Sequence, residues 1–276
     1  MRQKTQKRYV IGENVKATFD NGQIEIYSDN GTIWESWIEA AGLRRNEISS
    51  IRIAEGIVIL PDNVDGYKKD FRFFGGMKKL QHLDLNGFIT TGTTSMQGMF
   101  MLCPSLEQLD LKKLDTSGAK QMNCMFAGCS SLTKIQFGNF HTEKVADMNE
   151  MFMECHSLTD LDLSSFDTSN VTNMGKMFYN CTNLTNLDLR QFDTSKVTDM
   201  NSMFDGCKSI QCLDVSHFNT SKVTDMSHMF ANCKKLKRII MCVCADAGLC
   251  TTGMFTGCQE NMVVLSALTA AAPHTF

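Results

Sequence analysis

The chain has 276 residues, 43% hydrophobic and 21% charged, with a formal net charge of −3 at pH 7. This composition supports a folded core and excludes intrinsic disorder, and the balanced charge without long runs of one sign gives no basis for nucleic-acid binding. Twelve cysteines fall below the roughly 8–10% that is typical of disulfide-scaffold proteins. No stretch approaches the length of a membrane span, and the basic, polar segment from Met1 to Val10 is followed by no apolar run, so that we expect neither a span nor a signal peptide.

Residues 1–47 do not share the periodicity of the rest of the chain and predict an N-terminal cap. Two strand-like runs, Val15–Phe19 and Gln23–Ser28, flank an Asn-Gly pair that favours a hairpin turn. After a second Asp-Asn-Gly sequence, Thr32–Ala41 is a predicted helix with Trp34, Trp37 and Ile38 on one side. A polar cap is needed where a stack of repeats ends.

The region from 48 to 258 repeats with a period of 26 residues, and we expect about seven to eight units, followed by a tail at 259–276. Ile57 and Ile59 fall in the register of the later leucines, so that stacking is expected to begin there. The unit reads M-x-x-M-F-x-x-C-x-x-L-x-x-L-D-L-x-x-F-D-T-S-x-V-T-x. Its aromatic and thiol positions predict a core ladder of Phe100, Cys103, Phe126, Cys129, Phe152, Cys155, Phe178, Cys181, Phe204, Cys207, Phe230 and Cys233.

Each unit predicts a short helix and a short strand. Met200, Met203, Phe204, Cys207 and Ile210 have the spacing of one helical face, and the threonines Thr172, Thr198 and Thr224 stand where an N-cap would. Leu187 and Leu189 alternate with polar residues, as in a half-buried strand. Stacking of such units predicts an α/β solenoid, a right-handed coil of the leucine-rich repeat class with parallel strands.

The motif closely resembles that of a known family. The residues Met203-Phe204, Cys207, Leu213-Asp214-Val215, Phe218, Thr220-Ser221, Val223-Thr224 and Met226 are similar to the BspA-like leucine-rich repeat surface proteins of bacteria, including the repeat found in mycoplasma lipoproteins. The resemblance covers residues 57–258. It implies a cell-surface or secreted binding protein, with family members acting as adhesins.

The repeated cysteines have two interpretations. They are either small apolar core residues with reduced thiols or, because stacked units lie about 5 Å apart, candidates for disulfides. A looser group, Cys242, Cys244, Cys250 and Cys258, could form a zinc site, although its spacing matches no standard ligand pattern. We favour reduced core thiols and expect no metal and no cofactor.

The residues that flank the inward leucine of each strand should point outward and form a ligand-binding face. This face comprises the row of strand aspartates, which could equally be consensus polar residues satisfied by solvent, and two neighbouring outward rows of varied chemistry. The candidate residues are His82, Asp84, Gln108, Asp110, Lys134, Gln136, Asp160, Asp162, Asn186, Asp188, Arg190, Asp214 and Arg238.

No constellation of residues points to catalysis, because the six histidines are scattered and no nucleotide-binding signature occurs. The sequence therefore predicts a non-enzymatic protein that binds a protein or glycan through the sheet face, at the cell surface or secreted. The alternative is a cytoplasmic protein-interaction scaffold of the same fold, which the many cysteines and the absence of a visible export signal favour.

Overall fold

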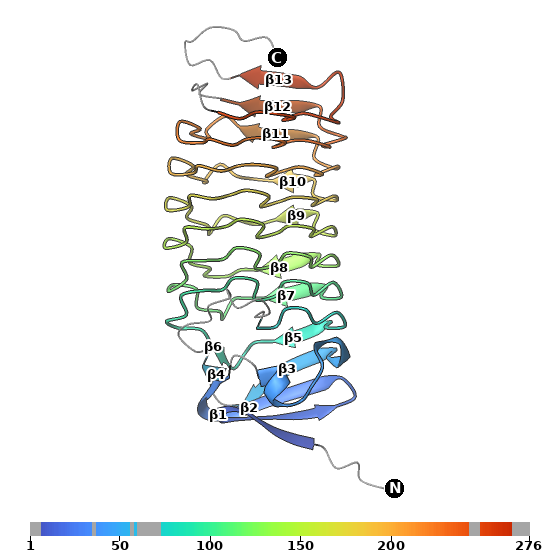
Figure 1. Cartoon of the computed structure of the whole chain (residues 1–276), viewed down its shortest axis with the longest axis vertical. Coiled ribbons are helices and arrows are strands. Elements are labelled where there is room, and N and C mark those ends of the chain that lie inside the picture. Colours follow the sequence, from blue (N-terminus) through green and yellow to red (C-terminus); the bar gives the residue numbers. More distant parts are fainter. Residues whose placement is uncertain (1–6, 35–36, 56–57, 60–72, 243–248, 267–276) are drawn as a thin grey trace.

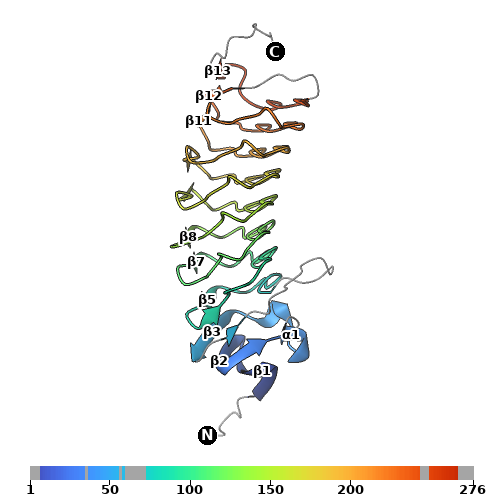
Figure 2. The ribbon, with the colours of Figure 1, turned by 90° about the vertical axis from the view of Figure 1, so that its left-hand side faces the viewer.

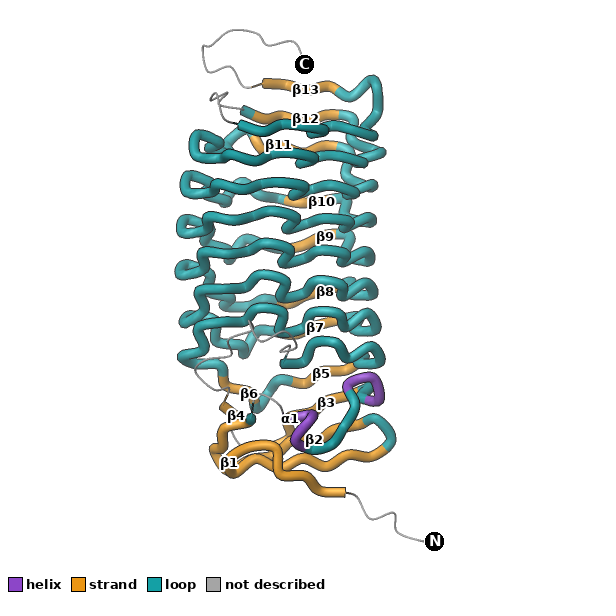
Figure 3. The backbone as a smooth tube through the Cα atoms, viewed as in Figure 1, coloured by secondary structure: helices purple, strands orange, loops and turns teal. Residues whose placement is uncertain are grey.

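The computed structural model describes residues 7–34, 37–55, 58–59, 73–242 and 249–266. These residues form an elongated, nearly straight column in which successive coils of chain lie one above another (Figures 1 and 2). The N-terminal end carries most of the strand content, and the coils above it are built mainly from turns and loops (Figure 3).

The N-terminal hairpin is present and is longer than predicted. Strands β1 (Lys7–Asp20) and β2 (Gln23–Ile33) pair antiparallel across the Asn21-Gly22 turn, where both residues have a positive φ. The predicted helix Thr32–Ala41 is largely wrong, because β2 continues to Ile33 and helix α1 covers only Trp37–Ala40. Trp37 is buried in the core, whereas Trp34 is 45% exposed. A short 3-10 helix, η1, follows at Arg45–Glu47.

The sheet of the cap continues directly into the repeat region. Strand β3 (Ser50–Glu55) pairs parallel with β2 and with β5 (His82–Asp84), and Ile51 is the register partner of Leu83. Strand β4 (Val58–Ile59) pairs instead with β2 and β6 (Phe88–Ile89). The register of Leu83 therefore leads back to Ile51 and Ile24 rather than to Ile59, and the other predicted starting residue, Ile57, lies outside the described residues.

Each later coil contributes one short strand to the same side of the column. These strands are β7 (Gln108–Asp110), β8 (Lys134–Gln136), β9 (Asp160–Leu161), β10 (Asn186–Leu187), β11 (Cys212–Val215), β12 (Arg238–Met241) and β13 (Val263–Ser266). Parallel pairing joins β7 to β8, β9 to β10, and β11 to β12 and β13. Parallel strand pairing therefore continues past residue 258, where the repeats were expected to end, because β13 pairs with β12.

The segment predicted as a helix in each unit is a series of tight turns. In the coil that contains Phe126, Cys124 and Gly128 have φ values of 57° and 74°, which a right-handed helix cannot contain. The N–H groups of Cys124, Phe126 and Gly128 donate to carbonyl oxygens of the next coil, at Asn149, Met151 and Met153, with N···O distances of 2.7–2.9 Å. The helical prediction is therefore wrong for this side of the coil, which we call the turn side.

The spacing of the coils explains why a helix does not form. The rings of Phe74, Phe100, Phe126, Phe152, Phe178, Phe204, Phe230 and Phe255 stack nearly parallel with centroids 5.3–5.8 Å apart. A helix with its side chains is about 10–12 Å wide, so that one helix per coil would force the column to bend strongly. The chain is therefore a β-solenoid of about eight coils.

The predicted N-cap threonines have a different role. The Thr198 hydroxyl donates to the Thr172 carbonyl oxygen, and the Thr224 hydroxyl donates to the Thr198 carbonyl oxygen, both at 3.1 Å. A second set of threonines, from the Asp-Thr-Ser segment, is buried. In that set the Thr194 hydroxyl donates to the Asn219 carbonyl oxygen at 3.1 Å and accepts from the Asn219 N–H at 2.7 Å. Hydroxyl groups therefore join adjacent coils at two corners of the column.

Candidate binding face

The strands hold the predicted outward residues on one face of the column. In β7, Gln108 and Asp110 are exposed on either side of the buried Leu109, and β11 alternates in the same way. Because side chains alternate across a strand, the candidates form two rows that run along the column. The first outward row contains His82, Gln108, Lys134, Asp160, Asn186, Cys212 and Arg238, and the second contains Asp84, Asp110, Gln136, Asp162, Asp188, Asp214 and Ile240.

The aspartates of the second outward row close the turn that follows each strand. Oδ1 of Asp162 accepts the backbone N–H of Ser164 at 3.0 Å, and Asp84, Asp110, Asp188 and Asp214 accept in the same way two residues later. The Ser164 hydroxyl and its backbone N–H lower the pKa of Asp162, because both hydrogen bonds favour the carboxylate. The row is therefore first of all a set of turn caps.

Asp188 makes the strongest contacts of this row. The Arg190 guanidinium lies against its carboxylate and, with the backbone N–H of Arg190, lowers the pKa of Asp188 to about 2. Both side chains are exposed to solvent. The predicted candidates Asp188 and Arg190 are therefore largely engaged with each other.

Side chains of the first outward row are mostly free of protein contacts. No hydrogen bond or ion pair with a described residue engages the side chains of His82, Gln108, Lys134, Asn186 or Arg238, and all five residues are exposed. They differ in charge and hydrogen-bonding capacity from one coil to the next. The row thus offers donors and acceptors that the fold itself does not use.

The face is hollowed at its N-terminal end, between β3, β5 and β7. A hollow of about 620 Å³ is lined by polar groups of the predicted candidates His82, Asp84, Gln108, Asp110 and Gln136, together with Arg52 and Glu107. The sequence prediction missed Arg52, which is the register partner of Asp84. The alternation of Ile51, Arg52 and Ile53 was the signal that could have placed it.

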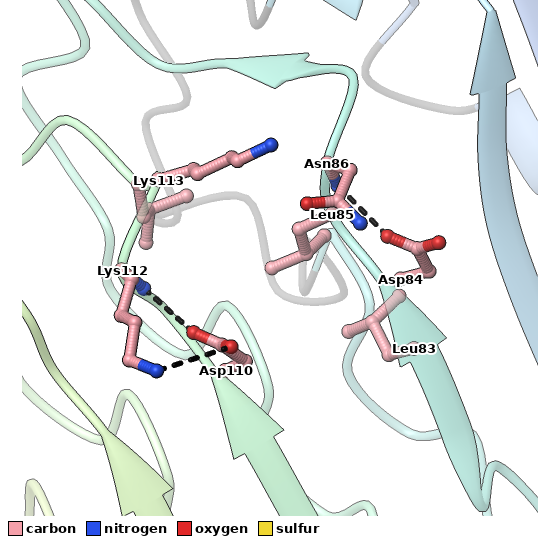
Figure 4. A pocket seen from close by; sticks show the side chains of 8 residues that line it. Leu83, Asp84, Leu85, Asn86, Asp110, Lys112 and Lys113 are labelled. Atoms are coloured by element: carbon pink, nitrogen blue, oxygen red, sulfur yellow. Dashed lines mark hydrogen bonds and ion pairs between the residues drawn. The ribbon is translucent and has the colours of Figure 1, made fainter.

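A second hollow of about 320 Å³ shares Leu83, Asp84 and Asp110 with the first and is otherwise lined by residues that follow β5 and β7. Figure 4 shows Lys112 directed back onto Asp110, with an Nζ···Oδ2 distance of 3.8 Å, and Lys113 directed across the hollow toward Asn86. Leu83, Leu85 and Leu114 contribute the apolar part of its lining. Together, the two hollows place acidic and basic side chains next to apolar ones at this end of the face.

The repeated cysteines lie in the interior, away from this face. Their thiols donate to the carbonyl oxygen of the phenylalanine one coil earlier, as Cys129 does to Phe100, at 3.0–3.2 Å. Burial raises the pKa of Cys181 to about 12, which disfavours the reactive thiolate. The phenylalanines of the predicted ladder are buried beside them.

The looser cysteine group is not assembled around one point in the described part of the chain. Cys258 continues the interior thiols and donates to the Phe230 carbonyl oxygen, whereas Cys250 is exposed and lies 3.5 Å from the Thr252 hydroxyl. Cys244 lies outside the described residues. Across residues 7–242 and 249–266, gaps excepted, no group of three or more His, Cys, Asp or Glu side chains could hold a metal ion. No helix in this part of the chain is long and apolar enough to cross a bilayer.

Comparison with solved structures gives two distant similarities. A leucine-rich repeat protein from Bacteroides ovatus is similar over 94% of this chain and 78% of that chain, with 14% identity and a TM-score of 0.36. The Toll–Spätzle complex of Drosophila is similar over 92% of this chain and 49% of that chain, with 12% identity and a TM-score of 0.19. No curated protein matches the sequence.

A family comparison covers the repeats themselves. Residues 70–166 and 155–266 match the family described as "Mycoplasma protein of unknown function, DUF285". The two matches together span most of the solenoid and well over half of the chain. The chain therefore belongs to the DUF285 family.

Proposed function

We propose that the chain is a non-enzymatic binding protein that holds a protein or glycan partner on the first outward row and its adjoining hollows. One observation carries the proposal. The inward positions repeat almost without change, whereas the first outward row varies from His82 through Lys134 to Arg238 and leaves most of its polar groups unused. Solenoids bind extended partners on such continuous surfaces.

The N-terminal end of the face is the best candidate for the centre of the contact. It is hollowed, and it combines Arg52, His82 and Gln108 with the carboxylates of Asp84 and Asp110. A polar partner can exchange hydrogen bonds with all of these groups, and the half-buried Leu83 adds an apolar contact. Convergent polar groups around an apolar base are typical of ligand sites.

The proposed location is the cell surface or the surrounding medium. The motif quoted above resembles that of the BspA-like surface proteins, whose members act as adhesins, and this resemblance is what supports the location. Protease treatment of intact source cells is the test. We expect release of the chain from the surface or its recovery from the medium, and full protection with recovery in the cytosol would contradict the proposal.

Binding is tested with two matched variants. The face variant replaces His82, Gln108 and Lys134 by alanine, and the control replaces Lys120, Ser221 and Lys222, which are exposed on another side of the coil. The labelled wild-type chain is applied to glycan and protein arrays. For each ligand found, we expect the face variant to lose about tenfold or more in affinity, because truncation at a binding centre costs upward of 1 kcal/mol per residue. Equal binding by all three proteins would contradict the assignment of the face.

The alternative is an intracellular interaction scaffold with the same binding face. Eight of the described cysteines, among them Cys129, Cys181 and Cys212, are free, and free thiols are typical of reducing compartments. The surface protein and the intracellular scaffold can be distinguished by the number of free thiols. These are counted after rapid acid quenching of source cells, with and without a reductant. The scaffold requires fully reduced cysteines and a cytosolic location.

A further inference from the structure

The last coils carry a concentration of positive charge that the net charge of −3 hides. In the coil that ends in β12, four of five consecutive residues are exposed cations, and only Leu236 between them is buried. The coil before it adds Lys208, which precedes its strand by the same interval as Lys234 does. We call this set the basic edge, and its members are Lys208, Lys234, Lys235, Lys237 and Arg238.

The basic edge is not neutralised by the fold. None of its five side chains forms an ion pair with a described residue, in contrast to Lys112, Lys176 and Arg190 elsewhere in the column. Asp205, in the coil that contains Lys208, accepts a hydrogen bond from the Asn232 amide at 2.9 Å. Five unpaired like charges within two adjacent coils repel one another, and an anionic partner would relieve that repulsion.

Exposed aliphatic side chains lie beside these cations. Val263 of β13 is the register partner of Arg238, and Leu265 is the partner of Ile240. Val263 and Leu265 are 49% and 43% exposed. Ile240 and Leu265 stand in the row that holds aspartates in earlier coils, such as Asp188 and Asp214. At the C-terminal end of the column (Figure 1), the sheet face therefore changes from acidic to apolar and cationic.

We propose that the basic edge, with Val263 and Leu265, binds the surface of an anionic lipid bilayer. Charge complementarity selects an anionic partner, and each lysine or arginine near such a surface contributes roughly 1 kcal/mol. The adjacent aliphatic side chains can be buried in the headgroup region of a bilayer. A soluble polyanion offers these side chains no apolar surroundings. Base stacking by a nucleic acid has no large aromatic platform here, because no Phe, Tyr or Trp side chain of the described part of these coils is exposed.

The first test compares charge reversal at two places. Lys234→Glu, Lys235→Glu and Lys237→Glu together remove the centre of the basic edge, and Lys78→Glu, Lys79→Glu and Lys120→Glu make the same charge change elsewhere. Sedimentation is measured with phosphatidylcholine vesicles, with and without phosphatidylglycerol. We expect wild type and control to bind the anionic vesicles in a salt-sensitive way, and the basic-edge variant to lose on the order of 100-fold in affinity. Equal loss in both variants would overturn the proposal.

The second test separates a bilayer from a soluble polyanion. Val263→Ser with Leu265→Ser should weaken vesicle binding about tenfold, because two aliphatic side chains no longer leave water, and should leave retention on immobilised heparin unchanged. Binding of wild type to heparin or RNA without binding to anionic vesicles would overturn the proposal, as would vesicle binding that ignores lipid charge. Circular dichroism and the unfolding midpoint establish that each variant is folded. The result is independent of whether the first outward row binds a partner.

Discussion

The two long sides of each coil both form backbone hydrogen bonds to the next coil, but they do so with different backbone conformations. On the strand side, extended residues such as Cys212–Val215 pair in parallel with the next coil. On the turn side, alternate N–H groups of a turn series, such as those of Phe126 and Gly128, donate to the next coil, and positive φ values at residues such as Cys124 and Gly128 redirect the chain. Both sides therefore direct backbone hydrogen bonds along the column, whereas a helix would direct them within its own segment.

The comparison shows that a series of turns repeating every four residues can have the same spacing of inward side chains as a helix. Inward side chains on the turn side, such as Met122, Met125, Phe126 and Cys129, follow the spacing i, i+3, i+4 and i+7 that also marks a helical face. The coil spacing of about 5 Å decides against the helix. Turns, unlike helices, can be as thin as a strand, and this permits a straight column.

The largest effect is expected from opening the aromatic stack that both sides share. Phe178 is fully buried between the rings of Phe152 and Phe204. Phe178→Ala should lower the free energy of unfolding by about 3–5 kcal/mol, from lost burial and the cavity left behind. Urea unfolding followed by circular dichroism measures it. Phe178→Leu should cost less, and an alanine variant as stable as wild type would contradict a shared core.

The next largest effect concerns the corner between the two sides. Thr194→Val keeps the shape of the buried side chain but removes a hydroxyl that bonds both the carbonyl and the N–H of Asn219. We expect a loss of about 1–3 kcal/mol, because two groups of the neighbouring coil lose their partner. The exposed Thr185→Val is the control. Equal unfolding midpoints for the two variants would argue against a structural role for the buried hydroxyl.

The turn side is tested by a pair of opposite substitutions. Gly206 and Glu154 occupy equivalent positions and have φ values of 76° and 60°. Gly206→Ala should destabilise by about 1–2 kcal/mol, since a side chain is disfavoured at positive φ, and its Cβ would also press on the Asn180 amide. Glu154→Gly should stabilise by up to about 1 kcal/mol. Thermal unfolding of both variants measures the difference, and destabilisation by the glycine variant would contradict the positive-φ turn.

The smallest effect concerns the turn caps of the strand side. Hydrogen bonds from the residue two positions later lower the pKa values of Asp162, Asp188 and Asp214 in the folded chain. Above the unfolded-state pKa, near 3.9, their stabilisation is fully present, and it is lost as the pH falls toward about 2, the folded-state pKa of Asp188. Urea unfolding at a series of pH values should show this decline. Replacing all three by asparagine, which caps the same kind of turn at Asn219, should flatten it, and an unchanged slope would contradict the capping role.

The candidate face was predictable in outline and less so in detail. The alternation of polar residues with leucines such as Leu109 was enough to assign the outward rows, because successive side chains of a strand point to opposite faces. The contribution of Arg52 was not predicted, since β3 lies outside the 26-residue period and joins the face only through its pairing with β5. The engagement of Asp188 by Arg190 also depends on contacts that spacing alone does not specify.

The sequence by itself determined the 26-residue repeat, the inward and outward sides of each strand, the hairpin at Asn21-Gly22 and the stacking of equivalent residues. These features follow from local periodicity and turn chemistry. Only the tertiary structure decided that the Met-Phe-Cys segment is a series of turns rather than a helix, that parallel strand pairing starts in the cap and includes β13, and that threonines such as Thr198 bond between coils. The reason is that these outcomes depend on the distance between coils, and the stacked rings and strands of neighbouring units set that distance together.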